Sequence, residues 1–200
     1  MGETTLQDRR AAAAAAGGHA TNKYTSLKET ALAFIDAQAC NASLSSKMDF
    51  SALGQMVAPS YSHAFGPRYT VSAAPNLQGS FSIESFVEHL GRMIANLEAW
   101  HVEVRGCVVD EVGESVVLRA SYRVQVKGAE EVVENDVVWW LELEEGGSGS
   151  EIGEGNHGDG GWKVRKSTEM VDAGAVGRIR ELIVRTKGQA ARKDSAAVAE

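Results

Sequence analysis

The segment Glu134-Asn-Asp-Val-Val-Trp-Trp-Leu-Glu-Leu-Glu-Glu145 decides the fold, together with Gly161-Trp-Lys-Val-Arg-Lys-Ser-Thr-Glu-Met-Val-Asp172. Polar and apolar residues alternate in both, a pattern typical of strands that bury one face. We therefore predict strands over 132–144 and 162–170. The alternation assigns the side chains of the first strand to two faces: Asn135, Val137 and Trp139 on one, and Glu134, Asp136, Val138 and Trp140 on the other.

The rest of the chain supplies helices before these strands and one helix after them. The same period of two predicts strands over 101–109 and 115–127, with Gly113 and Gly128 in the turns. Helical spacing predicts three helices upstream, with Thr25 or Ser26, then Asp49, then Ser82 as N-caps, and with the third helix ending near Trp100. A closing helix is predicted over 173–185. Residues 61–77 are predicted to be an irregular loop beside a pocket.

This order predicts a single α+β domain over residues 24–186. Its shape is a cone-shaped barrel, in which a curved antiparallel sheet wraps around the N-terminal helices and leaves a cavity. Residues 1–23 and 187–200 lack an apolar period and are predicted to be disordered tails. Residues 146–161 are predicted to be a flexible, acidic, glycine-rich hairpin insertion.

The charge, the hydropathy and the cysteines of the chain indicate which partners and which cellular location to expect. A net charge of −7 argues against nucleic acid and against anionic membrane surfaces, which both attract basic proteins. No apolar run approaches the roughly 18 residues of a membrane span. Cys40 and Cys107 lie far apart without a CxxC motif, so we expect small buried thiols in a reducing, cytoplasmic setting.

No metal-binding signature, P-loop or GxSxG motif occurs, so we expect neither a metal nor a cofactor. Gly153-Glu-Gly-Asn-His-Gly158 does fit GxGxxG, but a dinucleotide site needs a strand before it and a helix after it. This segment instead lies between two antiparallel strands. Glu151, Glu154 and Asp159 lack the spacing of an EF-hand calcium loop.

The element order and the two quoted segments resemble the nuclear transport factor 2-like (SnoaL-like) superfamily. They are most similar to the small cyclases and isomerases of fungal polyketide and terpenoid pathways. The resemblance covers residues 26–186 and implies a cone that holds a small apolar molecule. Its relatives include ketosteroid isomerase, scytalone dehydratase, polyketide cyclases and non-catalytic carriers, so fold alone does not assign a reaction.

The resemblance also implies roles for particular residues. His101 resembles a histidine at the comparable place in scytalone dehydratase, and Asn135 and Glu169 resemble pocket polar groups of the fungal enzymes. One position departs from the pattern. Ketosteroid isomerase and SnoaL carry a working aspartate on the penultimate strand, where this chain has Trp139, which argues against steroid-isomerase chemistry.

Four residues are candidates for catalysis. His101 has the neutral-range pKa of a general acid or base, although it can equally be a structural histidine. Glu169 on a cavity wall would have a raised pKa and could shuttle a proton, or it could pair with Arg165 or Arg123. Tyr61, with His63, could stabilise a developing enolate, although loop residues are often simply solvated. Asn135 could orient a carbonyl or hydroxyl group.

Five residues are candidates for binding the substrate: Trp139, His63, Arg68, Tyr122 and His89. Trp139 could pack a flat ligand, or belong to the core. Arg68 could clamp a carboxylate, and His89 could instead be boundary packing.

Two functions remain open. One is an isomerase, cyclase or dehydratase that uses general acid–base chemistry on an apolar secondary-metabolite intermediate. The other is a non-catalytic module of the same fold that binds a small molecule or a protein. In both cases we predict a homodimer, because valines and tryptophans lie on the convex face of the sheet.

Overall fold

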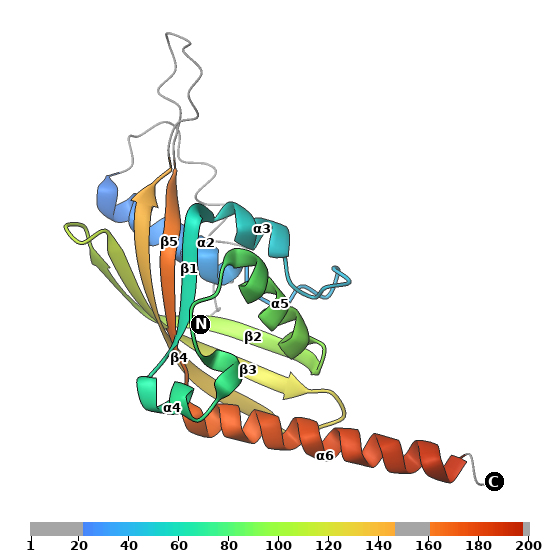
Figure 1. Ribbon diagram of the computed structural model, residues 1–200. Coiled ribbons are helices and arrows are strands. Elements are labelled where there is room, and N and C mark those ends of the chain that lie inside the picture. Colours follow the sequence, from blue (N-terminus) through green and yellow to red (C-terminus); the bar gives the residue numbers. More distant parts are fainter. Residues whose placement is uncertain (1–21, 147–160, 198–200) are drawn as a thin grey trace, which may run out of the picture.

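The computed structural model describes residues 22–146 and 161–197 (Figure 1). They form one α+β unit around a five-stranded sheet: β1 (Val57–Gly66), β2 (Leu97–Asp110), β3 (Ser115–Val126), β4 (Val132–Glu145) and β5 (Trp162–Met170). The strand order is β1-β5-β4-β3-β2, with β1 parallel to β5 and the other pairs antiparallel. Residues 1–21 of the tail predicted over 1–23, residues 147–160 of the predicted insertion and residues 198–200 lie outside the described residues, whereas Asn22 caps the first described helix and Lys23 begins it.

Four main helices accompany the sheet: α2 (Lys23–Asp36), α3 (Phe50–Gln55), α5 (Ile83–Ile94) and α6 (Ala173–Ala197). Two short elements, α4 (Arg68–Ser72) and η1 (Pro75–Leu77), connect β1 to α5. The Asp49 carboxylate and the Ser82 hydroxyl accept the first backbone N–H groups of α3 and α5, as predicted. Helix α2 begins before the predicted Thr25 or Ser26, because Asn22 caps it by accepting from the Thr25 amide.

The prediction of a loop over residues 61–77 was wrong. Strand β1 continues to Gly66 and pairs with β5, from His63 opposite Ser167 to Gly66 opposite Met170. Because β1 is an edge strand, Pro59 is tolerated where the register shifts between Val57 and Ser62. The segment therefore contributes rigid strand positions to the interior.

Two helix ends also differ from the prediction. Helix α5 ends at Ile94 rather than near Trp100, and β2 already begins at Leu97. Helix α6 continues to Ala197, past residue 187, where a disordered tail was predicted to begin. Alanine, lysine, arginine and glutamine are common in this extension and favour helix without an apolar face.

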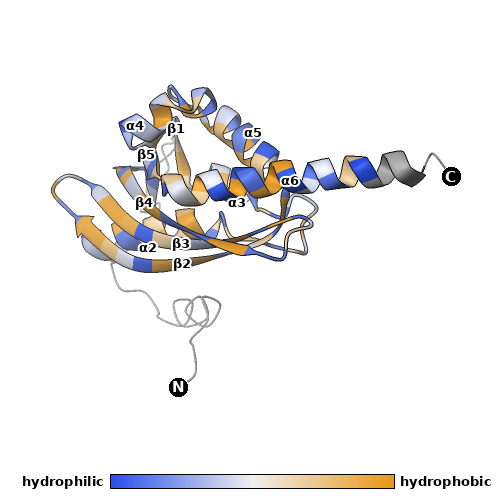
Figure 2. Cartoon of the chain, turned by 90° about the horizontal axis from the view of Figure 1, so that it is seen from below, coloured by the Kyte–Doolittle hydropathy of each residue, from blue (hydrophilic) through white to orange (hydrophobic). Residues whose placement is uncertain are grey.

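Helices α2, α5 and α6 pack on one face of the curved sheet, and this face holds the core (Figures 1 and 2). Helix α5 buries Phe86, Leu90 and Ile94, spaced four residues apart as one helical face requires. The alternation predicted for β4 is confirmed, because Trp139 is 1% exposed whereas Trp140 is 48% exposed. Figure 2 shows the same alternation of hydrophobic and hydrophilic residues in the strands and in α6.

Cys40 and Cys107 are free thiols of intermediate exposure. Among the helices of the described residues, none is both long enough and apolar enough to span a bilayer.

Candidate functional site

A cavity of about 350 Å³ lies between α5, α6 and the inner face of the sheet. Its wall is mainly apolar, with a few polar groups that converge from different elements. The polar and aromatic members are Gln38, Phe65, Asn76, His89, Arg92, Trp100, Tyr122, Asn135, Glu169 and Arg180. An apolar pocket with a small number of placed polar groups is the usual form of a small-molecule site.

A second hollow, of about 400 Å³, lies between the far half of α6 and the turn after β3. No carboxylate, histidine or tyrosine lines it, and its charged members are Lys127 and Lys187. The titratable groups that could carry chemistry therefore line the first cavity.

Glu169 is the carboxylate on the wall of this cavity. It lies near the end of β5, opposite Trp139 of β4 and Phe65 of β1. Its side chain is only 15% exposed, and this burial raises its pKa from 4.5 to about 8. Neither arginine considered as a partner reaches it: Arg165 pairs with Glu142 at 3.3 Å, and Arg123 is exposed. Glu169 is therefore a carboxylic acid that exchanges its proton near neutral pH.

A buried hydrogen-bonded chain lies beside Glu169. The Ser167 hydroxyl is 2.7 Å from the Tyr61 hydroxyl and 2.8 Å from Nδ1 of His63. Burial lowers the pKa of His63 to about 3, with a smaller contribution from the charge of His89, so the ring is neutral. Burial also raises the pKa of Tyr61, which keeps its proton.

The hydrogen bonds from Tyr61 through Ser167 to His63 have one preferred donor-to-acceptor direction. Among the described residues, Ser167 is the sole acceptor within reach of the Tyr61 hydroxyl, so Tyr61 donates to Ser167 and Ser167 donates to Nδ1 of His63. The proton of the neutral imidazole then sits on Nε2. This atom is buried, makes no hydrogen bond to the described residues, and lies 3.9 Å from Oε2 of Glu169. Nε2–H is thus directed to the carboxyl group but is too far for a direct hydrogen bond.

Aromatic rings surround His63 and explain its low pKa. Its ring stacks on Phe86 with centroids 4.0 Å apart and meets Phe65 edge-on at 4.5 Å. Phe81 and Trp139 complete the enclosure at 6.0 and 5.8 Å. These rings exclude water, so the charged form of the imidazole is not stabilised.

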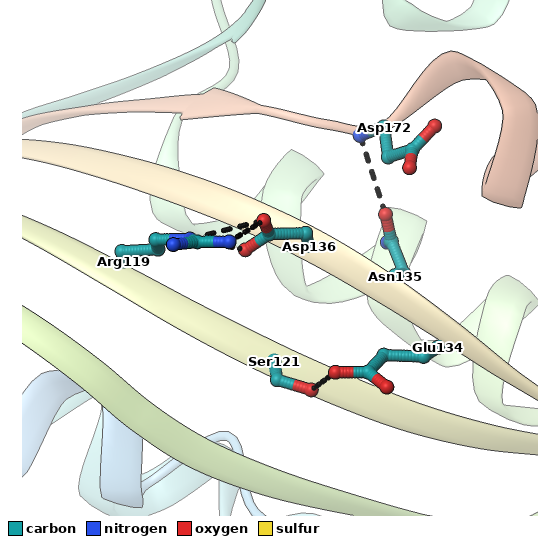
Figure 3. A network of polar contacts seen from close by, with 6 residues as sticks. All are labelled: Arg119, Ser121, Glu134, Asn135, Asp136 and Asp172. Atoms are coloured by element: carbon teal, nitrogen blue, oxygen red, sulfur yellow. Dashed lines mark hydrogen bonds and ion pairs between the residues drawn. The ribbon is translucent and has the colours of Figure 1, made fainter.

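Tyr122 and Asn135 form a second pair of polar groups, opposite each other on β3 and β4. The Tyr122 hydroxyl accepts from Nε1 of Trp139 at 3.1 Å. Burial, and next the charge of Glu169, raise the pKa of Tyr122, so it remains a phenol. Oδ1 of Asn135 accepts from the Asp172 amide at 3.3 Å, while its Nδ2 donates to no other described residue (Figure 3). Both residues can therefore offer a hydrogen-bond donor to a ligand.

Figure 3 also shows contacts made by side chains on the other face of β4. Arg119 donates to both carboxylate oxygens of Asp136, and Ser121 donates to Glu134 at 2.6 Å. Glu134 and Asp136 thus point away from Asn135, as the alternation predicted.

The candidate residues divide into two groups. Seven gather at or directly behind the cavity: Tyr61, His63, His89, Tyr122, Asn135, Trp139 and Glu169. His89 lines the cavity beside the rings of Phe65 and Phe81, and its pKa is lowered by burial and then by Arg92. His101 and Arg68 are exposed and lie outside the lining.

Two features of the site were not predicted from the sequence. Ser167 was not among the candidate residues, although it lies two positions before Glu169 on the same strand and therefore on the same face. Trp139, for which ligand packing and a place in the core were both open, lies outside the cavity lining and donates a hydrogen bond to the Tyr122 hydroxyl. Within residues 22–146 and 161–192, no group of three or more His, Cys, Asp or Glu side chains is arranged to hold a metal ion.

No protein-family profile matches the sequence, and no curated protein matches it. Solved structures do match its fold. PrhC from Penicillium brasilianum NBRC 6234 has a TM-score of 0.57 at 14% identity, covering 83% of this chain and 93% of that one. The BvnE pinacolase from Penicillium brevicompactum has a TM-score of 0.57 at 12% identity, covering 82% and 95%.

A bacterial structure agrees with these fungal ones. A candidate SnoaL-like polyketide cyclase from Jannaschia sp. CCS1 has a TM-score of 0.53 at 15% identity, covering 80% of this chain and 94% of that one. At such identities the likeness concerns the fold and assigns no reaction. The chain has the nuclear transport factor 2-like, SnoaL-like fold that its element order predicted.

Proposed function

We propose that this protein is an isomerase or cyclase that moves a proton on an apolar secondary-metabolite intermediate, with Glu169 as the acid and base. The observation that carries the proposal is a carboxyl group with a pKa of about 8 on the wall of an apolar cavity. A general acid or base works best when its pKa lies near the operating pH. The fold likeness to the BvnE pinacolase and to a candidate polyketide cyclase supports this choice.

In the proposed reaction, ionised Glu169 removes a proton from a carbon next to a carbonyl group. The electron pair of that C–H bond moves into an enolate, and Glu169 holds the proton. Glu169 then returns the proton to another carbon, which completes an isomerisation without net gain or loss of atoms. In a cyclase, the enolate carbon instead bonds to an electrophilic carbon of the same molecule, and the proton returns to the oxygen released there.

Neutral donors would stabilise the enolate oxygen. The Tyr122 hydroxyl and the Asn135 amide reach the cavity from β3 and β4. The buried Nε2–H group of His63 does not line the cavity, but from 3.9 Å it would stabilise the ionised carboxylate of Glu169. Tyr61 and Ser167 act through His63 as positioning residues, because they keep the proton on Nε2. His101 and Arg68 have no part in this mechanism.

Hydrogen–deuterium exchange into carbon acids tests the proposal. The full chain is incubated in D₂O with a panel of cyclic enones and β-diketones of terpenoid size, and deuterium uptake is followed by NMR and mass spectrometry. We expect the protein to accelerate exchange for members of the panel. Glu169→Gln should abolish the acceleration, because an amide cannot take up the proton, whereas the exposed control Glu98→Gln should retain it. Equal exchange by Glu169→Gln and wild type would refute the assignment.

A non-catalytic binding module is the second candidate. The observation that favours it is the tryptophan at position 139, where the resemblance expects a working aspartate on the penultimate strand. A panel compound that binds the cavity tightly, with no exchange above the buffer rate for any compound, would support this candidate over the enzyme.

A further inference from the structure

The mouth of the cavity is identified by the exposed members of its lining. Most lining residues are buried or half-buried, and Leu77, Leu90 and Leu97 are among the buried ones. The exposed ones come from three elements that approach one another: Asn76 on η1, Arg92 and Met93 on α5, and Arg180 on α6. The cavity therefore opens where η1, α5 and α6 meet.

This mouth is positively charged in a chain whose net charge is −7. Its exposed lining holds two arginines and no carboxylate. Arg92 pairs with Glu88 one turn away, but both side chains are more than half exposed, and such pairs contribute little. Arg180 forms no ion pair with the described residues.

The acid adjacent to Arg180 in sequence is engaged elsewhere. Glu181 is paired with Arg178, which also binds Glu131. The guanidinium of Arg180 is thus available to a ligand at the entrance. A guanidinium binds a carboxylate through two parallel hydrogen bonds, and the amide of Asn76 can add a third donor.

We propose that the ligand of this cavity is an amphipathic carboxylic acid, whose apolar body fills the cavity and whose carboxylate is held at the mouth by Arg180 and Arg92. This inference rests on the proposed function, since it takes the cavity to be the binding site. The carboxylate stays at the mouth because deeper burial would strip its water without supplying a cation. The apolar part is then presented to Glu169 and Tyr122, so the mouth sets which end of the molecule reacts.

Matched probes with and without the negative charge test the inference. Decanoate and 1-decanol have the same chain length and differ mainly in the head group. Isothermal titration calorimetry on the full chain at neutral pH, below the micelle concentration, gives both dissociation constants. We expect decanoate to bind about tenfold more tightly, because hydrogen bonds between charged groups are stronger than neutral ones. The preference should shrink as salt screens the mouth.

Variants of Arg92 on α5 and of Arg180 on α6 test whether the mouth causes the preference. Arg180→Gln should lower decanoate affinity several-fold and leave 1-decanol unchanged, and the double variant Arg92→Gln/Arg180→Gln should remove the preference. Arg185→Gln removes the same charge from an exposed site outside the lining, and it should change neither constant.

Three outcomes contradict the inference. Equal binding of acid and alcohol by the wild type, or a full preference in the double variant, overturns the proposed carboxylate site at the mouth and leaves the proposed proton transfer standing. Binding of neither probe overturns both, because the cavity would then not accept apolar ligands of this size.

Discussion

Replacing Glu169 with glutamine should stabilise the protein, and the gain should grow with pH. The pKa of Glu169 is about 8 in the folded state against an ordinary value of 4.5. Between these values the folded protein holds a proton that the unfolded chain has released, so stability falls as pH rises. The contribution of the Glu169 proton to the free energy of unfolding is fully present below pH 4.5. It is lost progressively as the pH rises to the folded pKa of about 8, and the loss levels off above that pH.

The difference of about 3.5 pKa units corresponds to about 5 kcal/mol above pH 8, and to about 3 kcal/mol at pH 7. Glutamine has nearly the same shape and no charge, so it removes this penalty. Urea denaturation of wild type and Glu169→Gln across pH 5–9 measures the difference in the free energy of unfolding. Other titrating groups are shared by the two proteins and cancel in that difference.

The control is Glu98→Gln, which removes an exposed carboxylate and should give a difference that does not vary with pH. A pH-independent difference for Glu169→Gln as well would show that the carboxyl group titrates as in water. That result would refute the burial argument and, with it, the basis for Glu169 as a neutral-range acid and base.

Three further predictions follow from the described contacts. Ser167→Ala should cost about 2–4 kcal/mol in urea denaturation, because Tyr61 and Nδ1 of His63 would both lose their buried partner; a loss under about 0.5 kcal/mol would contradict the hydrogen-bonded chain. Trp139→Phe should destabilise the protein by about 1–3 kcal/mol through lost packing and the lost hydrogen bond to the Tyr122 hydroxyl, whereas Trp140→Phe should change it by less than about 0.5 kcal/mol. The predicted homodimer is tested by sedimentation: if the sheet face that carries Trp140 forms it, Trp140→Glu should give monomers, and an unchanged dimer would place the interface elsewhere.

Strands with one buried and one solvated face could be predicted from the sequence, because each such strand has its own alternation of polar and apolar residues. The inward Trp139 and outward Trp140 are an example, and so is Asn135 on the cavity wall. Strand β1 could not be read in this way. It lies at the sheet edge and gains its order from parallel pairing with β5, roughly a hundred residues further along the chain.

The failure to predict β1 also explains why His101, rather than His63, was predicted as the acid–base histidine. His101 is an exposed histidine on β2 and lies outside the cavity lining. His63 stood in a supposed loop, so its contact with Ser167 could not be inferred. That contact exists because the parallel register sets His63 beside Ser167, and register between distant segments has no local signature.

The tryptophan at position 139 and the carboxylate at position 169 are two parts of one arrangement. They are direct neighbours in the β4–β5 register, so an acid sits one strand away from the place where the resemblance expected it, at the same level of the sheet. Trp139 is buried beside Glu169, meets the ring of Phe34 edge-on, and donates a hydrogen bond to the Tyr122 hydroxyl. An aspartate at position 139 would lie next to Glu169, and two neighbouring carboxyl groups would compete for one proton. The indole instead excludes water from that corner and fixes a phenol near the acid, and both effects favour a single carboxyl group that titrates near neutral pH.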